Sequence, residues 1–306
     1  MMPIKPNKLD IGDTIYIVCP SHSYTQSTYE RIFSCIKKNG YNVKFGKNIF
    51  KVNTYGTMAS LEERLTDFHD AVYDKDAKLV LFSGGQGAAE LLPHIDYEAI
   101  RENPKIFSSY SDGTSILNAL YFQSSLVTFY GCSPRIFDDM RYYNFCQFKS
   151  CFSDPNYAEF YSDTEWNVVA PGEAKGILIG GYYNRIAMML SNPFFSYDSN
   201  SSYLLFLEGL KDSFPPDVVA TYLAFLEQTD FFKQVSGIII GFYDNKIPVE
   251  FIEVLQCFAK RTALPIVYTD DFGHGVKQGI IPIGVEAHLI ATLKESRLFF
   301  DGNLIC

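Results

Sequence analysis

A cluster of hydroxyl side chains stands where a short apolar run gives way to a helical pattern, in the stretch IFSSYSDGTS at residues 106–115. Ser111 in this stretch would lie at the carboxyl end of a strand, where open parallel sheets bind their ligands. A hydroxyl on a sharp strand-to-helix turn is typical of a nucleophile, although the usual G-x-S-x-G is absent. A helix N-cap also favours serine, so this stretch alone leaves both interpretations open.

A serine nucleophile needs a base, and the chain has only five histidines. His274 stands between glycines in DDFGHGV, after an apolar run, and flanking glycines free the backbone to present an imidazole. His22 and His94 could line the same sheet edge, whereas His69 lies in a helical pattern and His288 in a strand-like alternation. His274 is therefore a candidate base, and a purely structural loop histidine is the alternative interpretation.

A carboxylate would orient such a base. Glu208 ends the apolar run YLLFLEG, and a charged group beside so apolar a run is rarely buried without a partner. An exposed strand end is the alternative interpretation. Serine, glutamate and histidine in this chain order would match several hydrolases of unrelated folds.

Glycines at 83–87, SGGQG, stand where another strand should end. Glycine at such a turn lets backbone N–H groups approach an anion or an oxyanion, and a purely structural turn is the alternative. A dinucleotide fingerprint fails here, because the sixth position from Gly85 is Glu90. We predict no cofactor, and no metal site either, because HExxH and other ligand spacings are absent.

The elements that position these residues follow a strand–helix alternation, which indicates a mostly parallel sheet with helices on both faces. The second helical pattern begins with a capping box at Ser60 and Glu63. The strand-like runs of this half lie at 14–21, 41–46, 77–85, 105–110 and 125–131, and the helical patterns at 27–40 and 60–74.

Residues 132–170 are aromatic and irregular, and strand-like runs resume after them. We therefore expect an α/β chain with a Rossmann-like parallel-sheet N-terminal domain at 1–135 and a connecting region at 136–170. A smaller, β-rich α+β domain would follow at 171–306. The aromatic segment 129–166 could shape a cleft or a dimer interface, and for Trp166 we favour core packing over stacking on a ligand.

Composition excludes several classes of function. Lys and Arg number 26 against 35 Asp and Glu, a net charge of −9 without a basic block, so nucleic acid and anionic membranes are poor partners. No apolar run is long enough to span a membrane, and the N-terminus lacks the apolar region of a signal peptide. Seven cysteines without CxxC indicate free thiols in a reducing compartment, which predicts the cytoplasm.

Taken in order, the segments of the chain resemble the LD-carboxypeptidase family of serine peptidases, which includes the microcin C self-immunity peptidases. Each segment is weak evidence alone, but their order and spacing are specific. In the first half they are IVCPS, LEERLTDFHDAVYD, GGQGAAELLPHID, NPKIFSSYSDGTSILNALY and SLVTFYG, and in the second half ILIGGYYNR, LLFLEG, SGIIIGF and FGHG followed by IPIG.

The resemblance implies a two-domain enzyme, commonly a homodimer, whose nucleophile falls on Ser111, carboxylate on Glu208 and base on His274. It places the oxyanion donors on the backbone N–H of Asp112 and on the glycine turn, with Gly85 as the favoured second donor. The triad would then span both domains.

Departures from the family pattern concern the substrate. The chain has Gln86 where the family often has tyrosine, Ser109 for the usual glycine, and GGYYNR in place of GGNL. An arginine common in the murein enzymes is missing from SFPPDVVATYL. A carboxypeptidase should offer a cation to the product carboxylate, and Arg185 and Lys277 are our candidates, with Gln86 as a further substrate contact.

The predicted function is therefore a serine-type carboxypeptidase that releases the terminal D-alanine from a murein tetrapeptide. Cleavage of an aminoacyl or peptidyl nucleotide, as in microcin immunity, is the alternative within the family. A non-catalytic peptide-binding protein on the same fold and a Rossmann-type oxidoreductase are the alternatives outside it.

Overall fold

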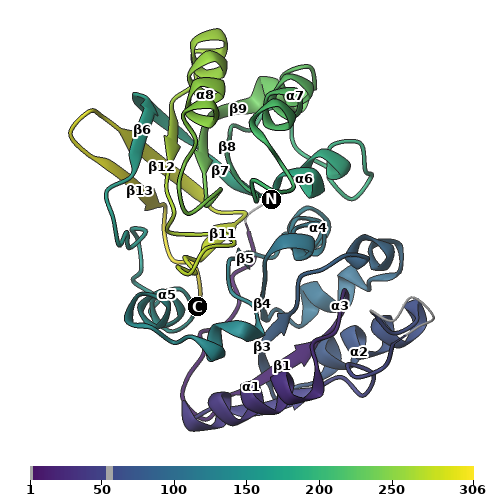
Figure 1. Cartoon of the computed structure of the whole chain (residues 1–306). Helices are drawn as coiled ribbons and strands as arrows, with labels where there is room; N and C mark the ends of the chain where they lie inside the picture. The colour runs from purple at the N-terminus through teal and green to yellow at the C-terminus, as the bar shows by residue number, and fades with distance from the viewer. Residues whose placement is uncertain (1–2, 53–57) are drawn as a thin grey trace.

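Two β-sheets organise the chain in the computed structural model, which describes residues 3–52 and 58–306 (Figure 1). The first sheet has the strand order β11-β5-β4-β3-β1-β2, and all its neighbouring strands are parallel except β11 and β5. Its strands are β1 (Thr14–Val18), β2 (Asn42–Phe45), β3 (Ala77–Phe82), β4 (Ile106–Ser109), β5 (Thr128–Tyr130) and β11 (Ile281–Ile283).

The second sheet has the order β13-β12-β7-β8-β9-β10-β6, with a parallel centre from β7 to β10 and antiparallel strands at both sides. Its strands are β6 (Asn167–Ala170), β7 (Gly172–Tyr182), β8 (Tyr203–Glu208), β9 (Val235–Ile240), β10 (Ile266–Tyr268), β12 (Glu286–Ala291) and β13 (Ser296–Phe300). The expected fold class, a parallel-sheet N-terminal part followed by a second sheet domain, is confirmed.

Helices cover both sheets. The α-helices are α1 (Gln26–Lys38), α2 (Leu61–Tyr73), α3 (Tyr97–Glu102), α4 (Thr114–Ser124), α5 (Tyr142–Ser153), α6 (Tyr183–Met189), α7 (Pro216–Glu227) and α8 (Val249–Thr262). Short 3₁₀ helices are η1 (Ala88–His94), η2 (Ser111–Gly113), η3 (Pro134–Asp138) and η4 (Phe231–Gln234). Among the described residues, every helix is too short or too polar to cross a membrane.

Local sequence explains these elements. Every residue of β1 and β8 is buried, as in parallel strands that are covered on both faces. Helix α2 begins with the predicted capping box at Ser60 and Glu63, and it buries Phe68 and Val72, one turn apart, against the first sheet.

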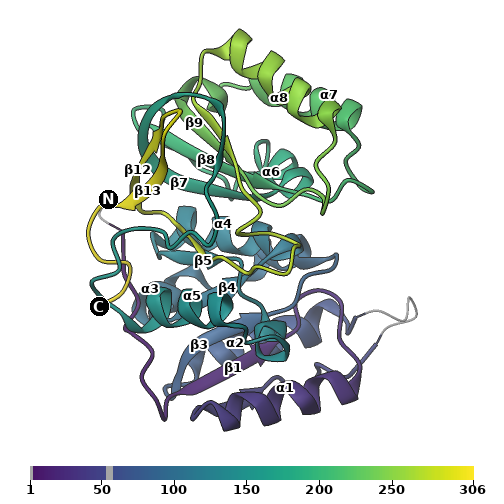
Figure 2. The same cartoon turned by 60° about the vertical axis from the view of Figure 1, so that its left-hand side comes forward.

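Helix α4 lies between the two sheets (Figure 2). It is buried on almost every side, and it packs against β4 and β5 of the first sheet and β7 of the second. The Asn118 side chain ties it to β7, because its amide donates to the carbonyl oxygen of Gly180 over 2.9 Å. The residues that follow Ser111 are thus held by both sheets.

The region from 132 to 170 is more regular than expected. It contains α5, whose Phe148 and Phe152 pack edge-on against each other, with Phe152 also against Phe129. The irregular sequence pattern did not indicate this helix, because the aromatic residues that lower helix propensity are stabilised by burial against the first sheet. Strand β6 from this region joins the second sheet, and β11 from the second half joins the first sheet.

Candidate active site

Ser111 stands at the turn from β4 into η2 and α4, at the carboxyl end of the parallel strands. Its φ is +57°, a conformation that non-glycine residues rarely adopt and that strains the backbone. The neighbouring turn approaches closely, since a Cβ on Gly84 would lie 3.0 Å from the Ser111 Cβ. Glycine at 84 therefore leaves room for the serine turn.

Tyr130 connects this turn to the carboxylate. The backbone N–H of Ser111 donates to the Tyr130 hydroxyl over 3.0 Å, and that hydroxyl donates to Oε1 of Glu208. Tyr130 is fully buried, and burial together with the Glu208 charge raises its pKa well above the usual value. The phenol therefore stays protonated and acts as the donor to Glu208.

Glu208 and His274 form a buried pair. Glu208 ends β8 with no exposed surface, and its Oε2 lies 2.8 Å from Nδ1 of His274. Burial alone would lower the pKa of His274, but the Glu208 charge and hydrogen bond outweigh it, and the pKa is raised. Because Nδ1 faces Glu208, Nε2 is the nitrogen available for proton transfer.

Two tyrosine rings hold the imidazole. The ring centroids of Tyr110 and Tyr182 lie 5.0 and 5.1 Å from that of His274. Since Tyr110 immediately precedes Ser111, this packing places His274 beside the serine turn. Within the described chain no hydrogen bond joins the Ser111 hydroxyl to His274, and such contacts are often long before substrate binds.

The serine turn is bonded directly to the second sheet. The hydroxyl of Thr114 donates to the Ser111 carbonyl over 2.6 Å and accepts from the backbone N–H of Tyr182 over 3.0 Å. Gly181 has a φ of +141°, and a Cβ there would lie 2.4 Å from the Thr114 hydroxyl. The glycine pair in ILIGGYYNR thus permits the close approach that joins the two halves of the site.

Asp112 fixes the turn through its side chain. The buried carboxylate accepts from the Ser21 hydroxyl over 2.6 Å and from the Ala88 N–H over 2.8 Å. It also forms an ion pair with Nε of Arg185, 2.5 Å away. Arg185, one of the two cations that we considered for a substrate carboxylate, is therefore engaged inside the protein.

Lys277, the other considered cation, lies 3.1–3.2 Å from three carboxylates. They belong to Asp163, Asp270 and Asp271, and Asp271 also accepts from the Trp166 indole. Trp166 is buried, in agreement with the preference for core packing. Lys277 thus stabilises an acidic cluster in this structure.

The glycine turn at 83–87 lies against His22, which follows strand β1. Gly85 has a φ of +132°, and a Cβ there would lie 2.8 Å from atoms of His22, so this position requires glycine. Gln86 is exposed on the same turn. Of the other histidines, His69 accepts from the Asp96 N–H at the edge of α3, and His288 pairs with Glu173 on the second sheet.

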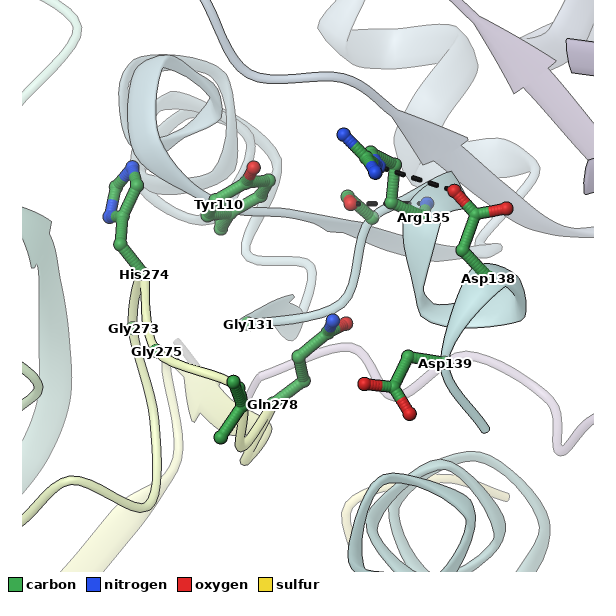
Figure 3. Close-up of a pocket in the computed structure, with 11 residues that line it drawn as sticks. Tyr110, Gly131, Arg135, Asp138, Asp139, Gly273, His274, Gly275 and Gln278 are labelled. Atoms are coloured by element: carbon green, nitrogen blue, oxygen red, sulfur yellow. Dashed lines mark hydrogen bonds and ion pairs between the residues drawn. The ribbon is translucent and has the colours of Figure 1, made fainter. Parts of the chain in front are cut away.

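A cavity of about 340 Å³ opens beside His274 (Figure 3). Its wall includes Tyr110, the loop Gly273–Gly275, Ser133, Gln278 and Arg135. Figure 3 shows His274 and Arg135 on opposite sides of Tyr110. The sequence did not point to Arg135 or Tyr130. Tyr130 ends the short strand β5 and Arg135 follows that strand, and neither belongs to a recognisable local motif.

Comparisons with known proteins agree with this architecture. Residues 15–131 match the model of the LD-carboxypeptidase N-terminal domain, and residues 175–289 match that of the C-terminal domain. The chain belongs to the LD-carboxypeptidase family. It is a peptidase of the serine carboxypeptidase type, and its family also includes microcin immunity peptidases.

Relatives of this family member cover almost its full length. A probable murein peptide carboxypeptidase of Bacillus subtilis is 28% identical, over 95% of this chain and 93% of its own. The microcin C7 self-immunity protein MccF of Escherichia coli is 26% identical, over 93% and 92%. The crystal structure of an MccF-like protein from Bacillus anthracis superposes with a TM-score of 0.87 at 25% identity, over 98% and 99%.

Proposed function

We propose that this LD-carboxypeptidase family member hydrolyses a peptide amide through Ser111, His274 and Glu208, and that its substrate is a murein tetrapeptide that loses its terminal D-alanine. The observation that carries the proposal is the buried Glu208–His274 pair beside a serine turn of positive φ. Tyr130 bridges that pair to the Ser111 backbone, so all three residues belong to one bonded unit.

The proposed reaction follows from the roles that this geometry permits. The Ser111 hydroxyl attacks the carbonyl carbon while Nε2 of His274 takes its proton and then passes it to the leaving amine. Glu208 holds the imidazole by Nδ1 and stabilises its positive charge. Water, activated by the same imidazole, then releases the acyl group from Ser111.

The oxyanion would be bound by backbone donors. We propose the N–H of Asp112 and one N–H from the glycine turn, with Gly85 as the favoured residue. A well-placed donor contributes roughly 3–4 kcal/mol to transition-state stabilisation. The buried Asp112 side chain supports this role, because its three partners hold the turn in one conformation.

The alternative substrate is an aminoacyl or peptidyl nucleotide. It is supported by the likeness to the microcin immunity protein and to the MccF-like structure. We also propose a homodimer in the cytoplasm: all seven cysteines are free, as expected of a reducing compartment, and light scattering of the purified protein tests the dimer.

The test of the proposed function is mass spectrometry of free and UDP-linked L-Ala-D-Glu-diaminopimelate-D-Ala after incubation with the protein. We expect the wild type to release one D-alanine and Ser111→Ala to be slower by roughly a thousandfold or more. Ser115→Ala, a second serine of the same hydroxyl cluster, should keep wild-type activity.

Equal cleavage by wild type and Ser111→Ala would exclude Ser111 as the nucleophile. Absence of peptide cleavage, together with cleavage of an aminoacyl sulfamoyl nucleoside that Ser111→Ala lacks, would retain the triad and replace the substrate.

A further inference from the structure

Two of the cationic side chains near the proposed active site are already paired with buried carboxylates. Arg185 pairs with the buried Asp112, and Lys277 pairs with three aspartates. Arg135 differs from both, since it lines the cavity that His274 also lines and its side chain is 54% exposed.

Arg135 is held in place while part of its guanidinium remains available. Its Nε donates to Oδ2 of Asp138 over 3.2 Å, and its guanidinium lies 5.9 Å from the centre of the Tyr24 ring. Asp138 already accepts two hydrogen bonds from Arg31, at 2.8 and 3.0 Å. In the part of the chain that the structure describes, the terminal nitrogens of Arg135 have no hydrogen-bond partner. Those nitrogens form the planar fork that binds carboxylates with two bonds.

The charged side chains that line this cavity are Arg135, Asp138 and Asp139. Each aspartate is also paired with an arginine that does not line the cavity, Asp138 with Arg31 and Asp139 with Arg141. Because these arginines balance the two carboxylates, the Arg135 guanidinium is the cation on this wall that can attract an anionic group.

The position of His274 identifies which part of a substrate this cavity would receive. In the proposed reaction His274 gives its proton to the leaving amine, so the leaving group must lie beside the imidazole. The cavity is lined by His274 and by Tyr110, the residue before Ser111, and it continues to Arg135. Its volume of about 340 Å³ is at the small end of ligand pockets, which suits a single amino acid.

We infer that Arg135 binds the free carboxylate of the C-terminal amino acid that the enzyme releases, and so restricts the enzyme to the last peptide bond. This inference rests on the proposed function, because it assigns the leaving-group side of the same site. Arg135 is a specificity residue in this scheme: without it the bond-breaking groups remain, but the preference for a free carboxyl end is lost.

The experiment compares two tetrapeptides that differ only at the end, one with a free carboxylate and one with a carboxamide. We expect wild-type kcat/KM to be roughly 10–100-fold higher for the free carboxylate, as for a charge-assisted hydrogen bond. Arg135→Gln should lose this preference while its rate on the carboxamide changes little, and Arg135→Lys should be intermediate because the ammonium lacks the fork.

Arg261→Gln is the matched control. Arg261 is similarly exposed, pairs with Glu227 and stacks on the Phe258 ring, but it lies on α8, remote from the cavity. It should keep the wild-type preference. A wild-type preference in Arg135→Gln, with circular dichroism unchanged, would overturn the inference.

Binding separates this inference from the proposed function. Calorimetry measures the affinities of the same two peptides without turnover. It compares the single variant Ser111→Ala with the double variant that also carries Arg135→Gln. If the wild type cleaves neither peptide, the proposed function fails. If the single and double variants also bind the free-carboxylate peptide with equal affinity, the inference about Arg135 fails as well. If Arg135→Gln weakened the binding of an aminoacyl sulfamoyl nucleoside only, Arg135 would bind the anionic group of a nucleotide-type substrate. That result would contradict the inference that Arg135 binds a peptide carboxylate.

Discussion

Two histidine–glutamate pairs in the described part of the chain have their glutamate on the second sheet, and they differ in their surroundings rather than in their chemistry. His274 and Glu208 lie 2.8 Å apart, with the carboxylate fully buried. His288 and Glu173 lie 3.1 Å apart, with the carboxylate side chain 67% exposed. Water screens the second pair, whereas the first is desolvated and faces Tyr130. Burial and a third partner, rather than residue type, distinguish a candidate catalytic pair from a surface pair.

The largest expected effect comes from neutralising the buried carboxylate. Glu208→Gln should lower kcat/KM by on the order of 10³–10⁴-fold, because the amide no longer holds the tautomer or stabilises the imidazolium. Glu173→Gln makes the same change in the exposed pair and should leave the rate unaltered. Steady-state kinetics on the tetrapeptide compares them, and similar losses in both variants would contradict the distinction between the pairs.

A second buried pair should respond through stability. Arg185→Met leaves the Asp112 carboxylate buried without its cation, and we expect the free energy of unfolding to fall by about 3 kcal/mol. The exposed pair of Lys233 and Asp230 is the comparison, and Lys233→Met should change stability too little to measure. Urea denaturation measures the stability of both variants. An unchanged unfolding midpoint for Arg185→Met would show that the buried pair of Arg185 and Asp112 does not contribute to stability.

The third partner of the buried pair gives a smaller effect. Tyr130→Phe removes the donor to Glu208 and the acceptor for the Ser111 N–H. We expect kcat to fall roughly 10–100-fold, as when one hydrogen bond to a charged group is lost, with KM little changed. The control is Tyr183→Phe, since that buried hydroxyl has no hydrogen-bond partner among the described residues. Wild-type kcat in Tyr130→Phe would mean that the pair does not need this contact.

The pH dependence gives the finest comparison. In the proposed reaction neutral His274 accepts the Ser111 proton, and the pKa of His274 is raised by Glu208 against the effect of burial. The acid limb of kcat/KM should therefore have its midpoint above 6.5, and Glu208→Gln should move it to lower pH. Because the raised pKa favours the protonated form, its contribution to stability is present below pH 6.5 and is lost as the pH rises through the folded-state value. An acid limb below 6.5 in the wild type would contradict the assignment.

Sequence patterns were sufficient for much of the fold. Buried parallel strands read as continuous apolar runs, and the capping box of α2 is a local signal, so these elements were predictable, although the strands end before the predicted runs do. Helix α5 was not predictable, because its aromatic residues are stabilised by packing against the first sheet rather than by helix propensity. The addition of β6 to the second sheet and of β11 to the first sheet depends on strand pairings far apart in the chain.

By itself, the sequence determined the candidate nucleophile, base and carboxylate, since Glu208 ends a strand, Ser111 and His274 follow strands, and all three lie in recognisable family segments. The tertiary structure alone decided which neighbours they have. Tyr130 donates to Glu208, 78 positions along the chain, Arg185 pairs with the buried Asp112, and Arg135 lines the same cavity as His274. These contacts join residues that no local pattern connects, because burial and charge partners in a folded chain are set by the packing of whole sheets.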